Sequence, residues 1–160
     1  MILLGIGELG ASGKPDEVIR TLALGSCVAV VLWSARAGAG GMVHVALPSS
    51  SLNPTQARRR PGRFADTGIA ALLDEMDRLG CGPGPSDLVA RIAGGAAVLD
   101  LGDHLDIGAR NVEAVRAVLA ERRLPLVGED VRGQISRSVE LEVGTGAVRV
   151  IAANRTSWEI

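Results

Sequence analysis

The most constraining feature of the sequence is the run VAVVLW at residues 28–33, which is apolar at every position. A short apolar run rich in β-branched residues is typical of a strand that is buried on both faces. The run is far too short to span a bilayer. A glycine-rich segment at 37–41 and an apolar segment at 42–47 follow it and end at Pro48, which predicts a β-hairpin. Aromatic residues make up only 2% of the chain, so the core around this strand must be aliphatic.

Apolar periodicity predicts the remaining elements of an α/β protein. Helices are expected at residues 63–79 and 107–123, where apolar residues recur at the spacing of one helical face. Strands are expected at 1–6, 18–22, 88–93 and 124–127, and a second hairpin at 139–150. The strands form hairpins as often as they flank helices. We therefore expect a single-domain α/β sandwich, with mixed sheets and two main helices, over residues 1–160.

Charge and cysteine content exclude several classes of protein. The chain has 17 basic and 18 acidic residues and a net charge of -1, which gives no electrostatic reason to expect nucleic acid or an anionic membrane as a partner. Cys27 and Cys81 are the two cysteines and do not make a disulfide framework. The N-terminus MILLGIGELG has no basic flank and does not resemble a signal peptide. We expect a cytoplasmic protein with reduced thiols.

Three motifs that could bind a ligand lack the context that binding requires. Residues 5–10 match GxGxxG, but the segment that follows, ending at Pro15, cannot form the helix that faces a dinucleotide, so we expect a flexible turn. Gly-Lys-Pro at 13–15 lacks the hydroxyl that a P-loop offers to Mg²⁺. The third candidate is a possible metal cluster of four residues: Asp100, Asp103, His104 and Asp106. It has no ligand spacing, and we expect a solvated loop that caps the second helix.

Arginines cluster in the proline-bounded segment 49–62 and directly after it. Arg58, Arg59, Arg60 and Arg63 lie within six positions of one another. One interpretation is a solvated polar loop, and the other is a surface that docks an acidic partner.

Cys27 is the candidate nucleophile. It follows Gly25-Ser26 and directly precedes the buried strand. A glycine permits a sharp bend that can lift the next side chains out of the sheet. It can also aim the backbone N–H groups of Ser26 and Cys27 into one concavity that suits an oxyanion. The alternative is that Cys27 is a small core residue, since unpaired cysteine is among the most buried residue types.

His44 is the candidate base, because it lies on the return strand of the predicted hairpin. A turn near residues 36–40 would pair His44 with Val31 and bring Cys27 opposite Pro48. This register does not put the two side chains in contact, so a Cys27–His44 dyad would need a bulge or a splayed strand end. The alternative is an ordinary buried or surface histidine within an apolar strand.

Several blocks of the sequence, in order, resemble the CheD family of chemoreceptor glutamine deamidases. The two most specific are Thr21-Leu-Ala-Leu-Gly-Ser-Cys-Val28 and Gly40-Gly-Met-Val-His-Val-Ala-Leu-Pro48. The others are Phe64-Ala-Asp-Thr67, Ile92-Ala-Gly-Gly-Ala96, Ile107-Gly-Ala-Arg-Asn111 and Glu129-Asp-Val-Arg-Gly133. Together the blocks extend over about residues 18–150.

The resemblance implies an α/β sandwich related to bacterial toxin deamidases, with a catalytic triad of Cys27, His44 and Thr21. Thr21 would hold the far nitrogen of His44 and set its tautomer. The implied reaction converts glutamine to glutamate through a cysteine thioester and needs no metal or organic cofactor. The implied substrate is the cytoplasmic helical bundle of a chemoreceptor. The implied partner is the CheC phosphatase, and some members also hydrolyse receptor methyl esters.

Three alternatives stay open beside the deamidase. A CheD-like protein could act chiefly as a binding module that regulates CheC, with little catalysis. A cysteine amidase or thioesterase could act on a small molecule. Cys27 could simply fill the core, in which case it would react with thiol reagents no faster than Cys81, which lies in a Gly-Pro loop without an evident partner.

Overall fold

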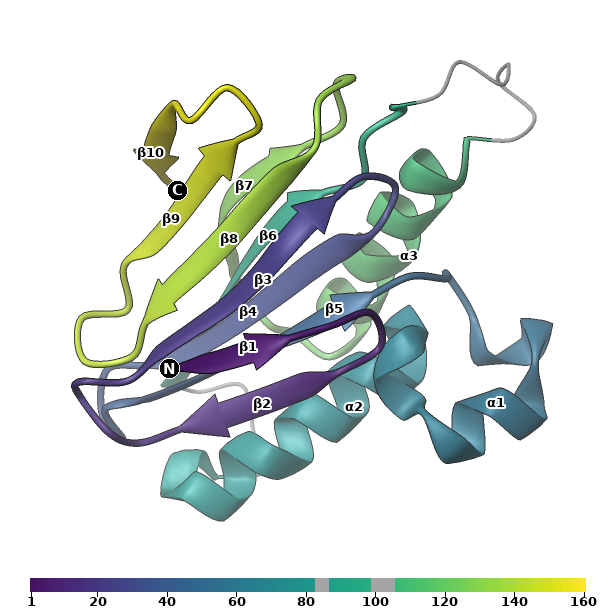
Figure 1. The fold of residues 1–160 in the computed structure, drawn as a ribbon. Coiled ribbons are helices and arrows are strands. Elements are labelled where there is room, and N and C mark those ends of the chain that lie inside the picture. The colour runs from purple at the N-terminus through teal and green to yellow at the C-terminus, as the bar shows by residue number, and fades with distance from the viewer. Residues whose placement is uncertain (83–86, 99–105) are drawn as a thin grey trace.

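Two five-stranded sheets make up most of the computed structural model, which describes residues 1–82, 87–98 and 106–160 (Figure 1). The sheets face each other across one aliphatic core. Helices α2 (Ala65–Met76) and α3 (Ile107–Glu121) cover the outer face of the second sheet across another core. Each layer buries one apolar face, which gives the α/β sandwich with mixed sheets and two main helices expected from the sequence.

The first sheet has the order β1-β3-β8-β9-β10. Its strands are β1 (Ile2–Leu4), β3 (Val18–Leu24), β8 (Arg137–Glu142), β9 (Val148–Ala152) and β10 (Ser157–Glu159). Only β1 and β3 pair in parallel. A β-bulge interrupts β3 between Thr21 and Leu24, where Ala23 has a φ of 53°. Because of the bulge, Thr21 and Leu24 are both buried while Leu22 and Ala23 between them are exposed.

The second sheet has the order β2-β5-β4-β6-β7. Its strands are β2 (Leu9–Ser12), β5 (Ala39–Val45), β4 (Val28–Ser34), β6 (Leu88–Gly94) and β7 (Leu126–Val131). β4 is the central strand. Its even-numbered residues from Val28 to Leu32 pack toward the helices, and Ala29 and Val31 pack toward the first sheet. The expectation of a strand buried on both faces is confirmed.

The segment expected as a polar loop at 49–62 is instead largely helical. It contains the 3₁₀ turns η1 (Ser50–Leu52) and η2 (Pro61–Arg63) and the short helix α1 (Pro54–Arg59). Local capping explains the difference, because the Asn53 side chain accepts a hydrogen bond from the Gln56 N–H and Pro54 occupies the first helical position. Prolines that suggest a loop in the sequence start these turns in the structure.

Two edge strands and one helix end also differ from expectation. Residues 9 and 10, expected in a turn, begin β2, and β10 lies in the segment after residue 153, for which the sequence predicts no element. Both strands are short and lie at sheet edges, where the apolar pattern is weak. α2 ends at Met76 and continues into a wide turn, η3 (Asp77–Cys81), in which Gly80 has a φ of 85°. Within the described ranges, no helix has the length and apolar character needed to cross a membrane.

Candidate active site

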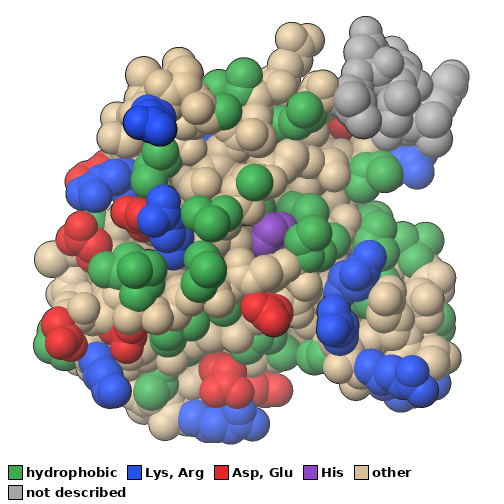
Figure 2. Space-filling model, in the orientation of Figure 1, with side chains coloured by type: hydrophobic (Ala, Val, Ile, Leu, Met, Phe, Trp, Pro, Cys, Tyr) green, Lys and Arg blue, Asp and Glu red, His purple; other side chains and the backbone are tan. Residues whose placement is uncertain are grey.

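The three candidate site residues come from neighbouring elements of the two sheets. Thr21 lies on β3 in the first sheet, His44 lies on β5 in the second, and Cys27 lies in the turn from β3 to β4. Thr21 is fully buried, His44 is 3% exposed and Cys27 is partly buried. Figure 2 shows a small histidine surface bordered by hydrophobic side chains. His44 is the one histidine in the described part of the chain, so the site opens on this face.

A hydrogen bond connects Thr21 and His44 across the gap between the sheets. The Thr21 hydroxyl lies 2.7 Å from His44 Nδ1 and 2.9 Å from the Leu4 carbonyl oxygen. A carbonyl can only accept, so the hydroxyl donates to Leu4 and must accept from a protonated Nδ1. His44 Nε2 is then the unprotonated nitrogen, and it is buried without a hydrogen-bond partner among the described residues. The arrangement defines the histidine tautomer that a base at Nε2 requires.

The observed register brings Cys27 nearer to His44 than the sequence suggested. His44 pairs with Ala29, two residues earlier on β4 than the expected Val31, because the chain turns at residues 35–38. Cys27 precedes Ala29 by two residues and packs with it against the core between the sheets, the side to which His44 also points. The two residues are therefore diagonal neighbours on one face, a relation that side chains can span without a splayed strand.

The turn that carries Cys27 is held by its carbonyl groups. The Gly25 carbonyl accepts from the Ala96 N–H at 2.8 Å, and the Cys27 carbonyl accepts from the Gly95 N–H at 2.7 Å. The Ser26 carbonyl accepts from the Asn111 side chain at 2.9 Å. Within the described residues, nothing accepts a hydrogen bond from the N–H of Ser26 or Cys27. Three consecutive carbonyls of the turn are thus occupied, while the adjacent N–H groups of Ser26 and Cys27 have no acceptor within the described part of the chain.

In the sequence Asn111 belongs to a helix-opening block, and in the structure it makes specific contacts near Cys27. It is fully buried on α3, and its Nδ2 donates both to the Ser26 carbonyl and to the Ala46 carbonyl, at 2.9 and 3.0 Å. Ala46 is two residues beyond His44. One side chain therefore joins the Cys27 turn to the end of the His44 strand. A fully buried asparagine needs hydrogen-bond partners. The sequence shows only that Asn111 is polar and does not indicate that these partners are the Ser26 and Ala46 carbonyls.

The GxGxxG segment forms hydrogen bonds with the backbone of His44. The Gly7 N–H donates to the His44 carbonyl at 2.9 Å, and the His44 N–H donates to the Glu8 carbonyl at 3.0 Å. Gly7 has a φ of 75°, in the region that favours glycine. A turn was expected here, and its function in the structure is to continue the pairing of β2 with β5 around the histidine.

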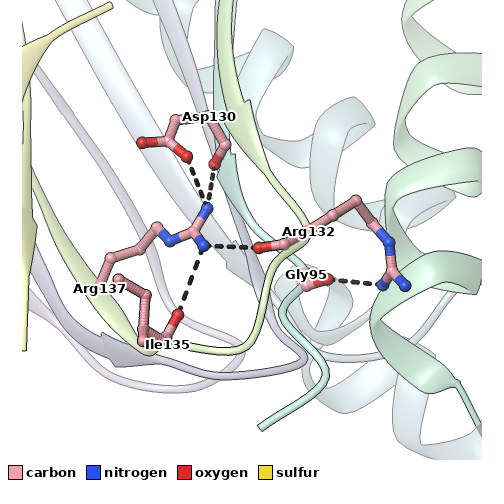
Figure 3. Close-up of polar contacts among 5 residues, drawn as sticks. All are labelled: Gly95, Asp130, Arg132, Ile135 and Arg137. Atoms are coloured by element: carbon pink, nitrogen blue, oxygen red, sulfur yellow. Dashed lines mark hydrogen bonds and ion pairs between the residues drawn. The ribbon is translucent and has the colours of Figure 1, made fainter.

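Two ion pairs, one partly exposed and one largely buried, lie next to the segment that binds the Cys27 turn. Arg132 donates to the Gly95 carbonyl at 2.7 Å (Figure 3). Arg132 also forms an ion pair with Asp106. Arg137 is 5% exposed and binds both the carboxylate and the carbonyl of Asp130, each at 2.7 Å. Because Gly95 also binds Cys27, the position of the turn depends on this network.

Of the four residues considered as a metal cluster, Asp106 lies in the described part of the chain, and it caps a helix. Asp106 accepts from the Ala109 N–H at 2.9 Å at the start of α3, which confirms the expected cap. Asp100, Asp103 and His104 lie outside the described residues. No group of three potential metal ligands occurs within the ranges that the structure describes. Cys81 is buried in the core beside the helices, and burial raises the pKa of its thiol.

Burial favours the neutral forms of both Cys27 and His44. Desolvation raises the pKa of the Cys27 thiol, and the charge of Arg63 opposes this in part. Desolvation lowers the pKa of His44 to about 4, against a smaller opposing effect of Glu8. At neutral pH the free protein therefore holds Cys27 as a thiol and His44 as an unprotonated imidazole, rather than as a thiolate and an imidazolium.

The lowered pKa of His44 predicts a specific loss of stability in acid. The unfolded chain binds a proton below pH 6.5 while the folded protein does not until about pH 4, so protonation favours unfolding across this window. We expect the free energy of unfolding to fall by about 2 kcal/mol more for the wild type than for His44→Asn between pH 7 and pH 4.5. Urea unfolding at both pH values measures the difference. An equal fall in the two proteins would contradict a buried neutral His44.

The family model for CheD chemotactic sensory transduction matches residues 46–152. A protein of Syntrophotalea carbinolica named probable chemoreceptor glutamine deamidase CheD is 45% identical over 99% of this chain and 98% of its own. The chemoreceptor glutamine deamidase CheD of Thermotoga maritima is 40% identical over 92% of this chain and 89% of its own. A Bacillus licheniformis hypothetical protein, YfiH, superposes with a TM-score of 0.47 at 15% identity, over 76% of this chain and 49% of that one.

Proposed function

Since this chain belongs to the CheD family, we propose that it is a protein-glutamine deamidase that converts chemoreceptor glutamines to glutamate through a thioester on Cys27. The observation that carries the catalytic assignment is the Thr21–His44 hydrogen bond of 2.7 Å. It leaves Nε2 of a neutral imidazole as the base, on the face of the sheet that also carries Cys27. Thr21 acts as the positioning residue that holds this tautomer.

The first half of the reaction forms the thioester. The substrate carboxamide enters beside Cys27, and Nε2 of His44 takes the thiol proton as sulfur attacks the amide carbon. The carbonyl oxygen becomes an oxyanion and accepts hydrogen bonds from the free N–H groups of Ser26 and Cys27, each contributing about 3 kcal/mol. His44 then gives its proton to the departing nitrogen, the C–N bond breaks, and ammonia leaves.

The second half of the reaction is hydrolysis. Water attacks the thioester carbon while Nε2 takes its proton, and the same two N–H groups hold the second oxyanion. The C–S bond breaks, the proton returns to sulfur, and glutamate is released. Because the resting pair is neutral, proton transfer accompanies each attack, and the base stays competent down to about pH 4. The same steps would release methanol from a receptor methyl ester.

The proposal extends to the setting of the reaction. The substrate is the cytoplasmic helical bundle of a chemoreceptor, which makes the enzyme cytoplasmic, and the CheC phosphatase is the regulatory partner. Asn111 is a positioning residue, since it ties the Cys27 turn to the His44 strand.

Mass spectrometry of a chemoreceptor cytoplasmic fragment from the same genome tests the proposal. After incubation with the protein, we expect specific glutamines to be converted to glutamates, and free glutamine amide and simple methyl esters to be turned over far more slowly. Conversion of the small amides at the same rate would favour a small-molecule amidase. No conversion by a folded protein would reject the enzyme and leave the CheC-binding module.

A further inference from the structure

We propose that Arg58, Arg59, Arg60 and Arg63 form an arginine surface that binds acidic side chains of a helical protein substrate beside the target glutamine. The proposal rests on the proposed deamidase function and names the chemistry of the substrate that the site receives. Of the two interpretations of these arginines, a solvated loop or a docking surface, we favour the docking surface.

The arginine surface carries charge that the protein itself does not neutralise. Residues 49–64 contain four arginines and no acidic residue, in a chain whose net charge is -1. None of the four forms an ion pair with a described residue, whereas Arg20, Arg36, Arg116 and Arg137 elsewhere all do. Arg63 Nε is buried without a partner within the described chain. Unpaired guanidinium groups in this density repel one another, and a carboxylate partner would remove that cost.

The arginine surface borders the candidate active site. The Arg63 carbonyl accepts from the N–H groups of Ala46 and Leu47, both at 2.9 Å, directly after the strand that carries His44. The backbone of Arg63 also lies against Gly7, whose N–H binds the His44 carbonyl. Burial raises the pKa of the Cys27 thiol, and the charge of Arg63 is close enough to oppose this rise in part. In Figure 2, Lys and Arg side chains gather over the α1 region, on the same face as the histidine surface.

The segment that presents the arginines is ordered by its own contacts. Asp66 accepts from the Ser50 N–H at 2.9 Å, and the Thr67 hydroxyl donates to the Pro61 carbonyl at 2.7 Å. Asn53 caps α1. An open hollow lies alongside, lined mainly by Ser50, Ser51, Pro54, Ala57, Pro61 and Thr67. A fixed segment presents guanidinium groups at a lower entropic cost than a mobile loop.

An acidic helix is the partner that these features fit. Guanidinium groups bind carboxylates through paired, charge-assisted hydrogen bonds, which favours glutamate or aspartate side chains one or two helical turns from the target glutamine. The hollow beside α1 would receive the apolar side of such a helix. Nucleic acid and anionic membranes call for a broad basic face, and the even balance of charge over the chain does not supply one.

Two peptides and two matched variants test the arginine surface. Each peptide is a helix with a single glutamine, flanked one turn away on both sides by glutamates or by alanines. The variant Arg58→Ser/Arg59→Ser removes two exposed arginines of the surface, and Arg122→Ser/Arg123→Ser removes two exposed arginines after α3 as a control. At low salt we expect the wild type to convert the acidic peptide with a kcat/KM about fivefold above that of the alanine peptide.

We expect the surface variant to lose about fivefold in kcat/KM on the acidic peptide through KM, and the control variant to match the wild type. Equal kcat/KM for the two peptides, or an equal loss in the control variant, would overturn the proposal. Anisotropy measurements of acidic-peptide binding to the Cys27→Ala protein separate docking from catalysis. Binding that depends on the arginines would uphold the surface even if no peptide were deamidated. Arginine-dependent binding to phosphatidylserine vesicles without any effect on peptide kinetics would assign the surface to a membrane and overturn the proposal.

Discussion

Replacing Cys27 with alanine is expected to lower the rate of receptor deamidation by at least about 10³-fold, because no other side chain can form the thioester. Cys27 is partly buried and lies in a turn held by its backbone carbonyls, so the substitution should leave the fold intact. Mass spectrometry of the receptor fragment measures the loss. In the wild type, rapid acid quenching is expected to trap an adduct in which the substrate acyl group has replaced the proton of Cys27.

Cys81→Ala is the matched control for this experiment. Cys81 is 2% exposed and lies in the core beside the helices, so its truncation should lower stability and leave the deamidation rate of the folded protein near that of the wild type. Cys27→Ser separates nucleophilicity from shape, and we expect it to be nearly as inactive as Cys27→Ala. Retention of a tenth or more of the activity by folded Cys27→Ala would reject Cys27 as the nucleophile.

The substitution Asn111→Asp is expected to lower kcat by about 10²-fold with little change in KM, because it disturbs the N–H groups of Ser26 and Cys27 to which we assign oxyanion binding. Aspartate keeps the size of the side chain, but a carboxylate offers no donor to the Ser26 and Ala46 carbonyls that Asn111 binds. The turn would then lose one of its three carbonyl contacts. Steady-state kinetics on the receptor fragment measure the effect, and the rate of Cys27 alkylation against pH reports the environment of the thiol.

Val115→Ala provides the control for a purely structural effect. Val115 is fully buried on the same helix, and its truncation should cost about 2 kcal/mol of stability without touching the turn. If Val115→Ala loses as much kcat as Asn111→Asp at equal loss of melting temperature, then Asn111 acts only through stability. A normal kcat in Asn111→Asp would remove it from the catalytic arrangement altogether.

Much of the architecture could be predicted from the sequence, because the relevant signals are local. The double-sided apolar character of β4 identifies it as a central strand, and one-sided periodicity identifies α2 and α3. The predictions failed where contacts with distant parts of the chain determine the secondary structure. The short strands β2 and β10 exist because a neighbouring strand edge offers hydrogen bonds. The turns between 50 and 63 depend on caps and on contacts with Asp66 and Thr67.

By itself, the sequence determined the composition of the core, the order of the main elements and the types of candidate reactive side chain, because hydrophobic periodicity and residue chemistry are properties of short segments. Only the tertiary structure decided that Thr21 meets His44, since the two lie in different sheets. The tertiary structure also decided the pairing of His44 with Ala29, which a shift of the turn by a residue or two would alter. The contacts of Asn111 with Ser26 and Ala46 span 85 and 65 residues, distances along the chain over which no local pattern carries information.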